Sequence, residues 1–438
     1  MASKHAFWYY ENNFQFFFLP EVIDSGHPPF FGMSLAALWK IFGQELWVGH
    51  MAMLPFLLGI IFLSAKIANY FFEEMGYVIL LLLIAVDPFI LGQAVLVSPD
   101  VPVLFAFLLG IYAILRKHSA WKVVAALLLA AVSMRGMMLV VVLFLFDLCR
   151  DLDFKTISIK VFLQKVAPYI PSGLFGLTFL VAHYQYAGWI GYHENSSWAP
   201  AFEKVGLMGA LRNIGLIIWR LLDFGRISIC LLLSIGGGFY FYKNGLKNQK
   251  AKELLLLLTL AVLILTPSLI IHKHLTAHRY LLPITTLMNF AVVFVLLQTI
   301  KKQLWQKALA AILVLSLFTG NAWVYPQKIA QGWDSTLGHW PYYDLRQQML
   351  DYIAKEKIPL EKIGTDFPNN TDLKYIDLKP GIGTFPLFDL KTQDYILYSN
   401  IYNDFSDEAI DELSQNWKVK KQLERFNICV ILYERERR

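Results

Sequence analysis

The chain has 438 residues, of which 56% are hydrophobic and only 16% are charged, and its formal net charge is +6. A soluble domain is typically about 45–50% apolar and about 25% charged, so this composition excludes a soluble, disordered or disulfide-stapled protein and indicates a polytopic membrane protein. Lys and Arg lie in short segments between apolar runs, as in the cytoplasmic loops of membrane proteins, so the positive charge requires no nucleic-acid partner.

The first segment, residues 1–44, is rich in aromatic residues and lacks the apolar core of a signal peptide. Within it, residues 28–43 form a short apolar pattern that starts at two prolines and ends at a glycine. This pattern predicts an interfacial helix, because it is too short to span a bilayer. The segment would begin on the outer side of the membrane, so we expect a first transmembrane helix to be missing in front of it.

Apolar runs of membrane-spanning length predict about ten spans in the bundle of residues 45–325. These runs lie near residues 45–68, 77–95, 101–116, 120–133, 137–150, 160–183, 226–243, 253–271, 280–299 and 306–325. Between them, residues 206–222 alternate apolar and basic positions at helical spacing and predict a second interfacial helix. The basic loops all fall on one side, which the positive-inside rule makes cytoplasmic. Residues 1–44 and everything after 325 then lie outside the cytoplasm.

Charged residues become frequent after Pro326, so residues 326–438 predict a small extracytoplasmic α/β domain. Two amphipathic patterns, residues 344–357 and 407–417, predict helices, and Ser406 is an expected N-cap of the second. Two runs rich in β-branched and aromatic residues, 394–400 and 428–435, predict strands. The expected fold class is therefore mainly α, a membrane helical bundle with a small α/β domain at its C-terminus.

Three acidic residues on the predicted outer side are candidates for catalysis: Glu11, Asp24 and Asp100. Asp24 precedes the Gly-His-Pro-Pro segment, where helix capping or solvation is the simpler interpretation. Asp100 follows Ser98 and Pro99 at the start of a span. The helix dipole alone favours a carboxylate there, but ionisable groups at membrane depth are costly and are often functional.

Residues 272–279, which connect two predicted spans on the outer side, are rich in cationic residues, contrary to the positive-inside trend. They include three histidines together with Lys273 and Arg279. An anion clamp for a phosphate explains them better than a metal site, because no acidic residue lies at ligand spacing. Contact with lipid headgroups is the simpler alternative. Arg135 lies between two apolar helices on the same side and is a candidate member of the clamp.

Together these segments resemble the GT-C superfamily of membrane glycosyltransferases, in particular the group that contains protein O-mannosyltransferases and aminoarabinose transferases. The resemblance extends over about residues 7–325. It rests on Gly26-His27-Pro28-Pro29-Phe30 leading into Leu38-Trp39-Lys40-Ile41-Phe42-Gly43, on Ser98-Pro99-Asp100, and on Arg279-Tyr280-Leu-Leu-Pro283. It implies an acidic residue in the first outer loop, for which Asp24 and Glu11 are candidates, and a second at the start of a later span, which Asp100 matches.

The resemblance implies transfer of a sugar, with inversion, from a polyprenyl-phosphate donor to a hydroxyl of a glycan, lipid or protein acceptor on the outer face of a bacterial inner membrane. Asp24 or Glu11 would accept the proton, and Asp100 would orient the base or share its role. The lipid phosphate would be held by His27, Arg135, Lys273, His278 and Arg279. A metal or other cofactor is not indicated.

Two alternatives remain open at this point. One is a transporter or flippase of a lipid-linked or anionic substrate, which would show repeated halves and polar residues near the middle of the membrane. The sequence shows no such repeat, and its polar residues gather at one face. The other is a catalytically inactive GT-C-like assembly protein that uses the C-terminal domain as its contact surface.

Overall fold

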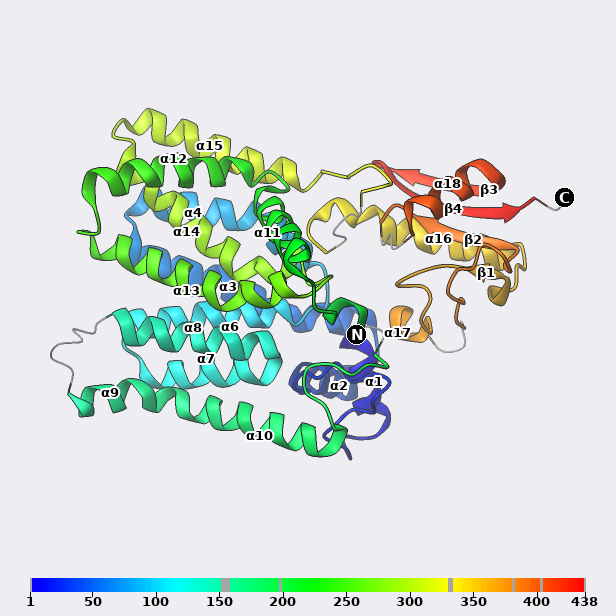
Figure 1. Ribbon diagram of the computed structural model, residues 1–438, viewed down its shortest axis with the longest axis horizontal. Coiled ribbons are helices and arrows are strands. Elements are labelled where there is room, and N and C mark those ends of the chain that lie inside the picture. The colour runs from blue at the N-terminus through cyan, green and yellow to red at the C-terminus, as the bar shows by residue number, and fades with distance from the viewer. Residues whose placement is uncertain are drawn as a thin grey trace. The chain divides into compact units, whose positions relative to one another are not determined.

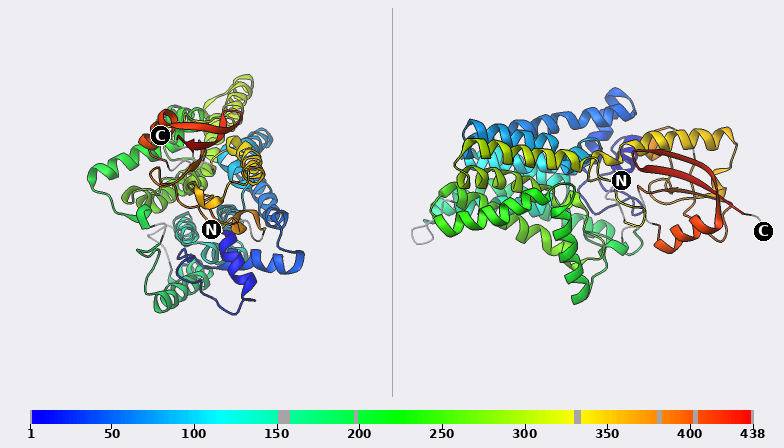
Figure 2. Two further views of the ribbon diagram at one scale, coloured as in Figure 1. Left: turned by 90° about the vertical axis from the view of Figure 1, so that its right-hand side faces the viewer. Right: turned by 90° about the horizontal axis from the view of Figure 1, so that it is seen from above.

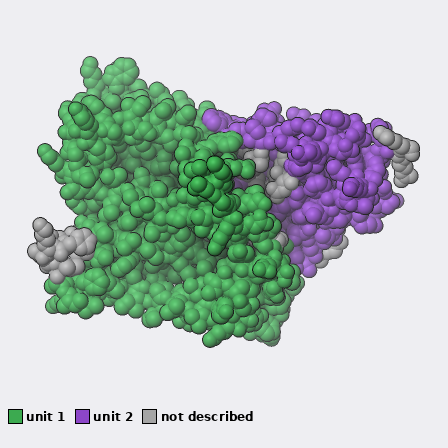
Figure 3. All heavy atoms as spheres, in the orientation of Figure 1, with its two compact units in different colours: residues 1–43, 47–320 green, residues 44–46, 321–438 purple. Residues whose placement is uncertain are grey.

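The computed structural model describes residues 2–150, 158–196, 199–329, 334–379, 383–401 and 405–436. It divides into two compact units, shown in different colours in Figure 3: unit 1 is Met1–Gly43 with Trp47–Gly320, and unit 2 is Gln44–Leu46 with Asn321–Arg438. The division near residue 320 lies close to the expected start of the C-terminal domain at residue 326, whereas the first outer loop belongs to unit 1.

Unit 1 is a bundle of helices, most of which run side by side and are joined by short connections (Figures 1 and 2). Each predicted span coincides with one helix or with two consecutive helices. The helices are α1 (Ala2–Glu11), α2 (Phe30–Phe42), α3 (Leu46–Phe71), α4 (Glu74–Val86), α5 (Pro88–Ala94), α6 (Asp100–Leu115), α7 (Ser119–Val132), α8 (Met134–Arg150), α9 (Ile159–Val166), α10 (Ile170–Ala187), α11 (Leu207–Leu222), α12 (Ile227–Asn244), α13 (Gln249–Ile271), α14 (Leu282–Thr299) and α15 (Gln303–Gly320).

Several of these helices are membrane spans by length and composition. Among the described residues, five segments are long and apolar enough to cross a bilayer, and α4 with α5 makes a sixth if the pair, bent by 53°, is counted as one span. Helices α2, α6 and α7 are apolar but shorter. The chain is therefore a multi-pass membrane protein, while the count of about ten spans stays a prediction.

Helix α14 lies at the centre of the bundle. In the segment that ends with it, 83% of the most apolar stretch is buried, against 22–33% in the other four long segments. Helices α4, α12, α13 and α15 contact α14, so protein covers most of its surface. The η3 turn (His278–Leu281), which precedes α14, is thereby held against the core of unit 1.

The bend between α4 and α5 is made by Asp87 and Pro88. The proline has no N–H to continue the helix, and the Asp87 carboxylate caps the new start by accepting from Phe89 N at 3.0 Å. The same carboxylate is paired with the fully buried Arg226 and accepts from Asn289 at 2.8 Å. Asp87 therefore caps the helix that follows the proline break, and the charge that it buries is compensated by Arg226.

The two segments expected to be interfacial are helices, α2 and α11, and their position at the interface stays a prediction. Helix α2 starts after Pro29 and ends at Gly43, whose φ of 91° favours glycine. Helix α11 runs across the direction of its neighbours α12 and α13 (Figure 1). Its apolar face stays uncovered, because the side chains at helical spacing along it are exposed: Leu207, Leu211, Ile214 and Ile218.

Unit 2 contains a four-stranded sheet in the order β1-β2-β4-β3. The strands are β1 (Ile363–Gly364), β2 (Tyr395–Ser399), β3 (Trp417–Arg425) and β4 (Ile428–Arg435), with β1 parallel to β2 and the other pairs antiparallel. Its helices are α16 (Pro341–Lys355), α17 (Lys374–Asp377) and α18 (Asp407–Asn416). Both predicted helices and both predicted strands are present, and Ser406 accepts from Ala409 N at 3.2 Å as the N-cap of α18.

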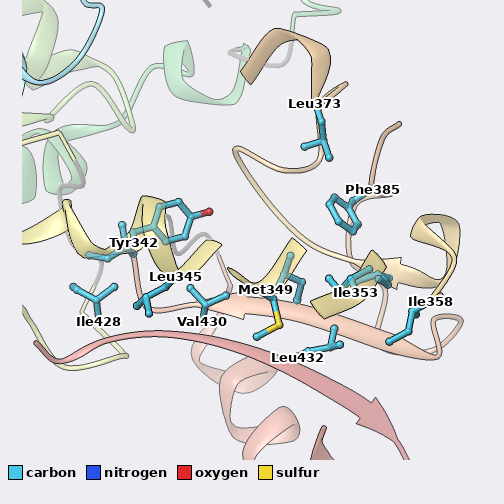
Figure 4. Close-up of a cluster of buried hydrophobic side chains, with 13 residues drawn as sticks. Tyr342, Leu345, Met349, Ile353, Ile358, Leu373, Phe385, Ile428, Val430 and Leu432 are labelled. Carbon is cyan, nitrogen blue, oxygen red and sulfur yellow. The ribbon is translucent and has the colours of Figure 1, made fainter. Parts of the chain in front are cut away.

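Strand β4 divides the core of unit 2 between the two faces of the sheet. Its side chains alternate, so Val430 and Leu432 pack with Leu345 and Met349 of α16 (Figure 4). On the other face, Cys429, Ile431 and Tyr433 belong to a second cluster, to which α18 contributes Ala409, Ile410 and Leu413.

Candidate functional site

Asp100 begins α6 at the end of the bundle that the charge pattern assigns to the outer face. The short connection before it turns at Ser98 and Pro99, and Ser98 Oγ accepts from the Asp100 backbone N–H at 3.2 Å. A carboxylate in the first turn of a helix is stabilised by the helix dipole. The Asp100 side chain is 12% exposed, so it stays accessible at the surface of unit 1.

Two arginines face this carboxylate from different helices. Arg135, at the start of α8, donates to Asp100 Oδ1, and Arg279 Nε in the η3 turn lies 3.9 Å from Oδ2. Between them lies Tyr280, whose ring is 3.9 Å from the Arg135 guanidinium and 5.2 Å from that of Arg279. One carboxylate and two guanidinium groups leave a positive charge, and both arginines are about a quarter exposed. We call Asp100, Arg135, Arg279 and Tyr280 the Asp100 cluster.

His27 lies near enough to the Asp100 cluster for its arginines to act on it. Its side chain keeps exposed surface, yet the protein around it removes enough water to lower its pKa to about 4, and the positive charges of Arg135 and Arg279 add to the shift. The imidazole is therefore neutral near pH 7. In this form it can offer one N–H and one acceptor nitrogen to a ligand.

The position of Arg135 is fixed by a close approach between α7 and α8. Ser133 Oγ accepts from Gly136 N at 3.0 Å and shapes the turn between the helices. A Cβ atom at Gly136 would lie 1.9 Å from the carbonyl oxygen of Leu129. Only glycine allows the two helix ends to meet so closely, and this meeting directs the start of α8 toward Asp100.

Asp24 lies in a separate network that holds the segment leading to His27. Its Oδ1 accepts from Gly26 N at 2.8 Å, and its Oδ2 lies 2.9 Å from Nε2 of His183 at the end of α10. The other nitrogen of His183 lies 3.0 Å from the carbonyl oxygen of Trp189. Both ring nitrogens of His183 are therefore engaged, and this buried pair fixes the segment that leads to His27.

The remaining predicted residues are engaged elsewhere or lie in solvent. Lys273 pairs with Glu203 at 2.9 Å, and both side chains are about half exposed. His278 is buried, lies 2.9 Å from Asp223 and packs against the rings of Phe89 and Phe224. Glu11 is exposed at the end of α1. Of the predicted site residues, the structure thus brings together Asp100, Arg135 and Arg279, and the charges of the two arginines reach His27.

Sequence reasoning assigned no role to Tyr280 or His183. Tyr280 directly follows Arg279, a predicted anion-binding residue, and this position in the sequence could have indicated that Tyr280 belongs to the site. His183 is 159 residues from Asp24, and nothing in the sequence connects the two. Within the described part of the chain, no group of three or more His, Cys, Asp and Glu residues is placed to hold a metal ion.

Comparison with known proteins gives a clear result for structure and none for sequence. No protein-family model matches the chain, and no curated protein sequence matches it. ArnT from Cupriavidus metallidurans in the apo state matches with a TM-score of 0.52 at 10% identity. ArnT from the same organism bound to undecaprenyl phosphate matches with a TM-score of 0.51 at 12% identity. Each match covers 98% of this chain and 92% of the ArnT chain.

The chain has the fold of ArnT. The likeness extends over 98% of the chain, and the expected helical bundle with a small C-terminal α/β unit is confirmed.

Proposed function

We propose that this protein is a GT-C-type glycosyltransferase that takes a sugar from a polyprenyl-phosphate donor and transfers it to an acceptor hydroxyl. The observation that carries the proposal is the Asp100 cluster, a partly exposed set of cations and one carboxylate. It occurs in a fold shared with ArnT, which has been solved with undecaprenyl phosphate bound.

The two arginines are suited to the lipid phosphate of the donor. Guanidinium groups bind phosphate oxygens through charge-assisted hydrogen bonds, and both retain exposed surface for this purpose. Neutral His27 adds a hydrogen-bond donor without further charge. As the sugar leaves, negative charge grows on the phosphate, and the arginines stabilise it.

Asp100 is the carboxylate nearest to these cations and is proposed as the base. The acceptor oxygen attacks the anomeric carbon, the bond from that carbon to the phosphate oxygen breaks, and the hydroxyl proton passes to Asp100. A phosphate bound to Arg135 and Arg279 competes with Asp100 for them, so donor binding releases the carboxylate for this step. A single displacement inverts the anomeric centre. Asp24, paired with His183, supports the His27 segment, and the described contacts of Glu11 give it no role.

The charge pattern supports a location for this reaction. Asp100 is at one end of α6, and the basic pair Arg116 and Lys117 follows the other end. By the positive-inside rule the basic end is cytoplasmic, which favours the extracytoplasmic face for the Asp100 cluster. Helix α15 ends on the same outer side in this topology, and the C-terminal domain follows it. The proposed acceptor on this side is a hydroxyl of a glycan, lipid or protein.

The test is transfer from a radiolabelled prenyl-phosphate sugar in proteoliposomes. We expect Asp100→Asn and Arg279→Ala to lower transfer at least tenfold, and Arg212→Ala, a change of an exposed arginine on α11, to leave it within about twofold of wild type. Unchanged transfer in both cluster variants would contradict the proposal. Movement of the labelled lipid across the bilayer without release of prenyl phosphate would favour a flippase instead.

A further inference from the structure

Unit 2 contains a groove of about 300 Å³ that the transferase proposal does not use. It is formed by the chain that enters the unit and by the strand pair β3 and β4. Its lining residues are Val324, Tyr325, Pro326, Gln327, Asn400, Gln422, Glu424, Asn427 and Cys429. This volume is at the lower end of the range for small-molecule sites and gives room for about one or two sugar rings.

The lining mixes polar groups with apolar ones such as Val324 and Pro326, and it carries no cation among its described residues. Four amides and one carboxylate, together with the hydroxyl of Tyr325, offer both donors and acceptors. Gln422, Glu424 and Asn427 are exposed and therefore reachable. Without Lys or Arg the groove does not suit a phosphate or another anion. Paired donors and acceptors of this kind suit a neutral ligand that carries many hydroxyl groups.

The hairpin at one end of the groove holds an aromatic residue in an unusual backbone state. Phe426 and Asn427 form the two-residue turn between β3 and β4, with φ values of 50° and 63°. Turns of this type favour glycine, and a bulky residue with positive φ costs about 1–2 kcal/mol. The Phe426 side chain is 76% exposed, and the guanidinium of the neighbouring Arg425 lies 5.6 Å from its ring, so packing within the chain offsets little of this cost.

The turn is also fixed in place. The Asn400 amide donates to the Asn427 carbonyl at 2.8 Å and accepts from Cys429 N at 2.9 Å, which joins the end of β2 to the hairpin. A rigid turn therefore presents an exposed ring next to Asn427, which lines the groove. Strained backbone and exposed aromatic surface concentrate at binding sites.

We propose that this groove binds a neutral saccharide, with Phe426 packing against the apolar C–H face of a sugar ring and the groove amides binding its hydroxyls. The saccharide class follows from the amides of a lining without a cation and from the exposed aromatic ring that directly precedes Asn427 in the chain. That this saccharide is the acceptor of the reaction rests on the proposed function, whereas binding itself does not.

The test measures binding of fluorescently labelled neutral mono- to tetrasaccharides of glucose, galactose, mannose and N-acetylglucosamine to the full chain in detergent. We expect at least one of them to bind. Phe426→Gly should weaken that binding at least tenfold while leaving the unfolding temperature unchanged or higher, because glycine relieves the turn. Phe426→Trp keeps the aromatic face and should stay within about threefold of wild type, and Gln422→Ala should weaken binding.

The matched control is Leu387→Ala, a change of an exposed side chain of unit 2 that does not line the groove. It should leave binding unchanged. Absence of binding by every saccharide, or equal binding by wild type and Phe426→Gly, overturns the inference, as does binding of acidic sugars alone. If saccharide binding fails while transfer from the prenyl-phosphate donor persists, only this inference falls. If transfer fails while the groove binds sugar, only the proposed function falls.

Discussion

Asp100 forms an ion pair with Arg135, and the two residues begin neighbouring helices of the bundle, α6 and α8. Both charges are at helix N-termini, where the helix dipole favours the carboxylate but not the guanidinium. When no other anion is present, the carboxylate of Asp100 therefore compensates the positive charge of Arg135. An incoming phosphate can replace the carboxylate as the partner of Arg135. We therefore expect Arg135 to strengthen phosphate binding and Asp100 to weaken it.

We expect Arg135→Ala to weaken binding of undecaprenyl phosphate by about tenfold to a hundredfold, since a hydrogen bond to a charged group contributes about 1.5–3 kcal/mol. Asp100→Asn removes the competing negative charge and should bind the lipid at least as tightly as wild type. Fluorescence titration of the detergent-solubilised protein measures both. Weaker binding by both variants would show that Asp100 supports the bound phosphate and does not compete with it.

The close contact at Gly136 gives a second prediction. Gly136→Ala places a methyl group against the Leu129 carbonyl, so α8 must move and carry Arg135 with it. We expect a loss of at least about 1–3 kcal/mol in stability and weaker lipid binding. Gly215→Ala on α11 is the matched control, because its new Cβ meets nothing within 4 Å. Equal stability of the two variants, measured by thermal unfolding, would contradict the tight packing described here.

Acid should destabilise unit 2 through His339. Burial lowers the pKa of this histidine to about 4, against the charge of Asp334, which raises it. Between about pH 6.5 and pH 4, His339 is therefore protonated in the unfolded chain but stays neutral in the folded chain. The stabilisation is complete above pH 6.5 and is lost as the pH falls toward 4, by up to about 3 kcal/mol for a buried group.

His339→Gln cannot take up this proton, so its unfolding temperature should fall less than that of wild type between pH 7 and pH 4. His274→Gln, at an exposed position of unit 1, serves as the control and should keep the wild-type slope. Parallel curves for wild type and His339→Gln would show that His339 does not govern the acid response.

The sequence predicted those elements whose apolar residues follow a helical or strand period. Helices α16 and α18 bury one face against the sheet and α11 carries one apolar face, so the period is visible in the chain itself. Strand β3 was missed because it is an edge strand of mostly charged and exposed residues, and its pairing with the apolar β4 forms it. Helix α1 was missed because it depends on tertiary contacts such as Phe7 against Trp39, with ring centroids 5.9 Å apart.

For the candidate site, the sequence indicated which residues share a face of the membrane but not which of them pair. The order of the spans places Asp100, Arg135 and Arg279 at the same end of the bundle, and this needs only a count of crossings. Which residues pair depends on helix rotation and on close contacts such as that at Gly136, which leave no pattern in the chain. The pairing of Asp24 with His183 therefore required coordinates.

The shortness of the helices that carry the Asp100 cluster has a consequence for the lipid around it. Helix α6 has 16 residues and α8 has 17, which correspond to about 24 Å and about 26 Å at 1.5 Å per residue. The hydrocarbon layer of a bilayer is about 30 Å thick. The bilayer must thin beside these helices, or their charged ends must lie below the level of the headgroups. In either case a prenyl lipid can bring its phosphate to Arg135 by sideways diffusion, without leaving the membrane, and the thickness of the bilayer becomes a variable that controls access to the site.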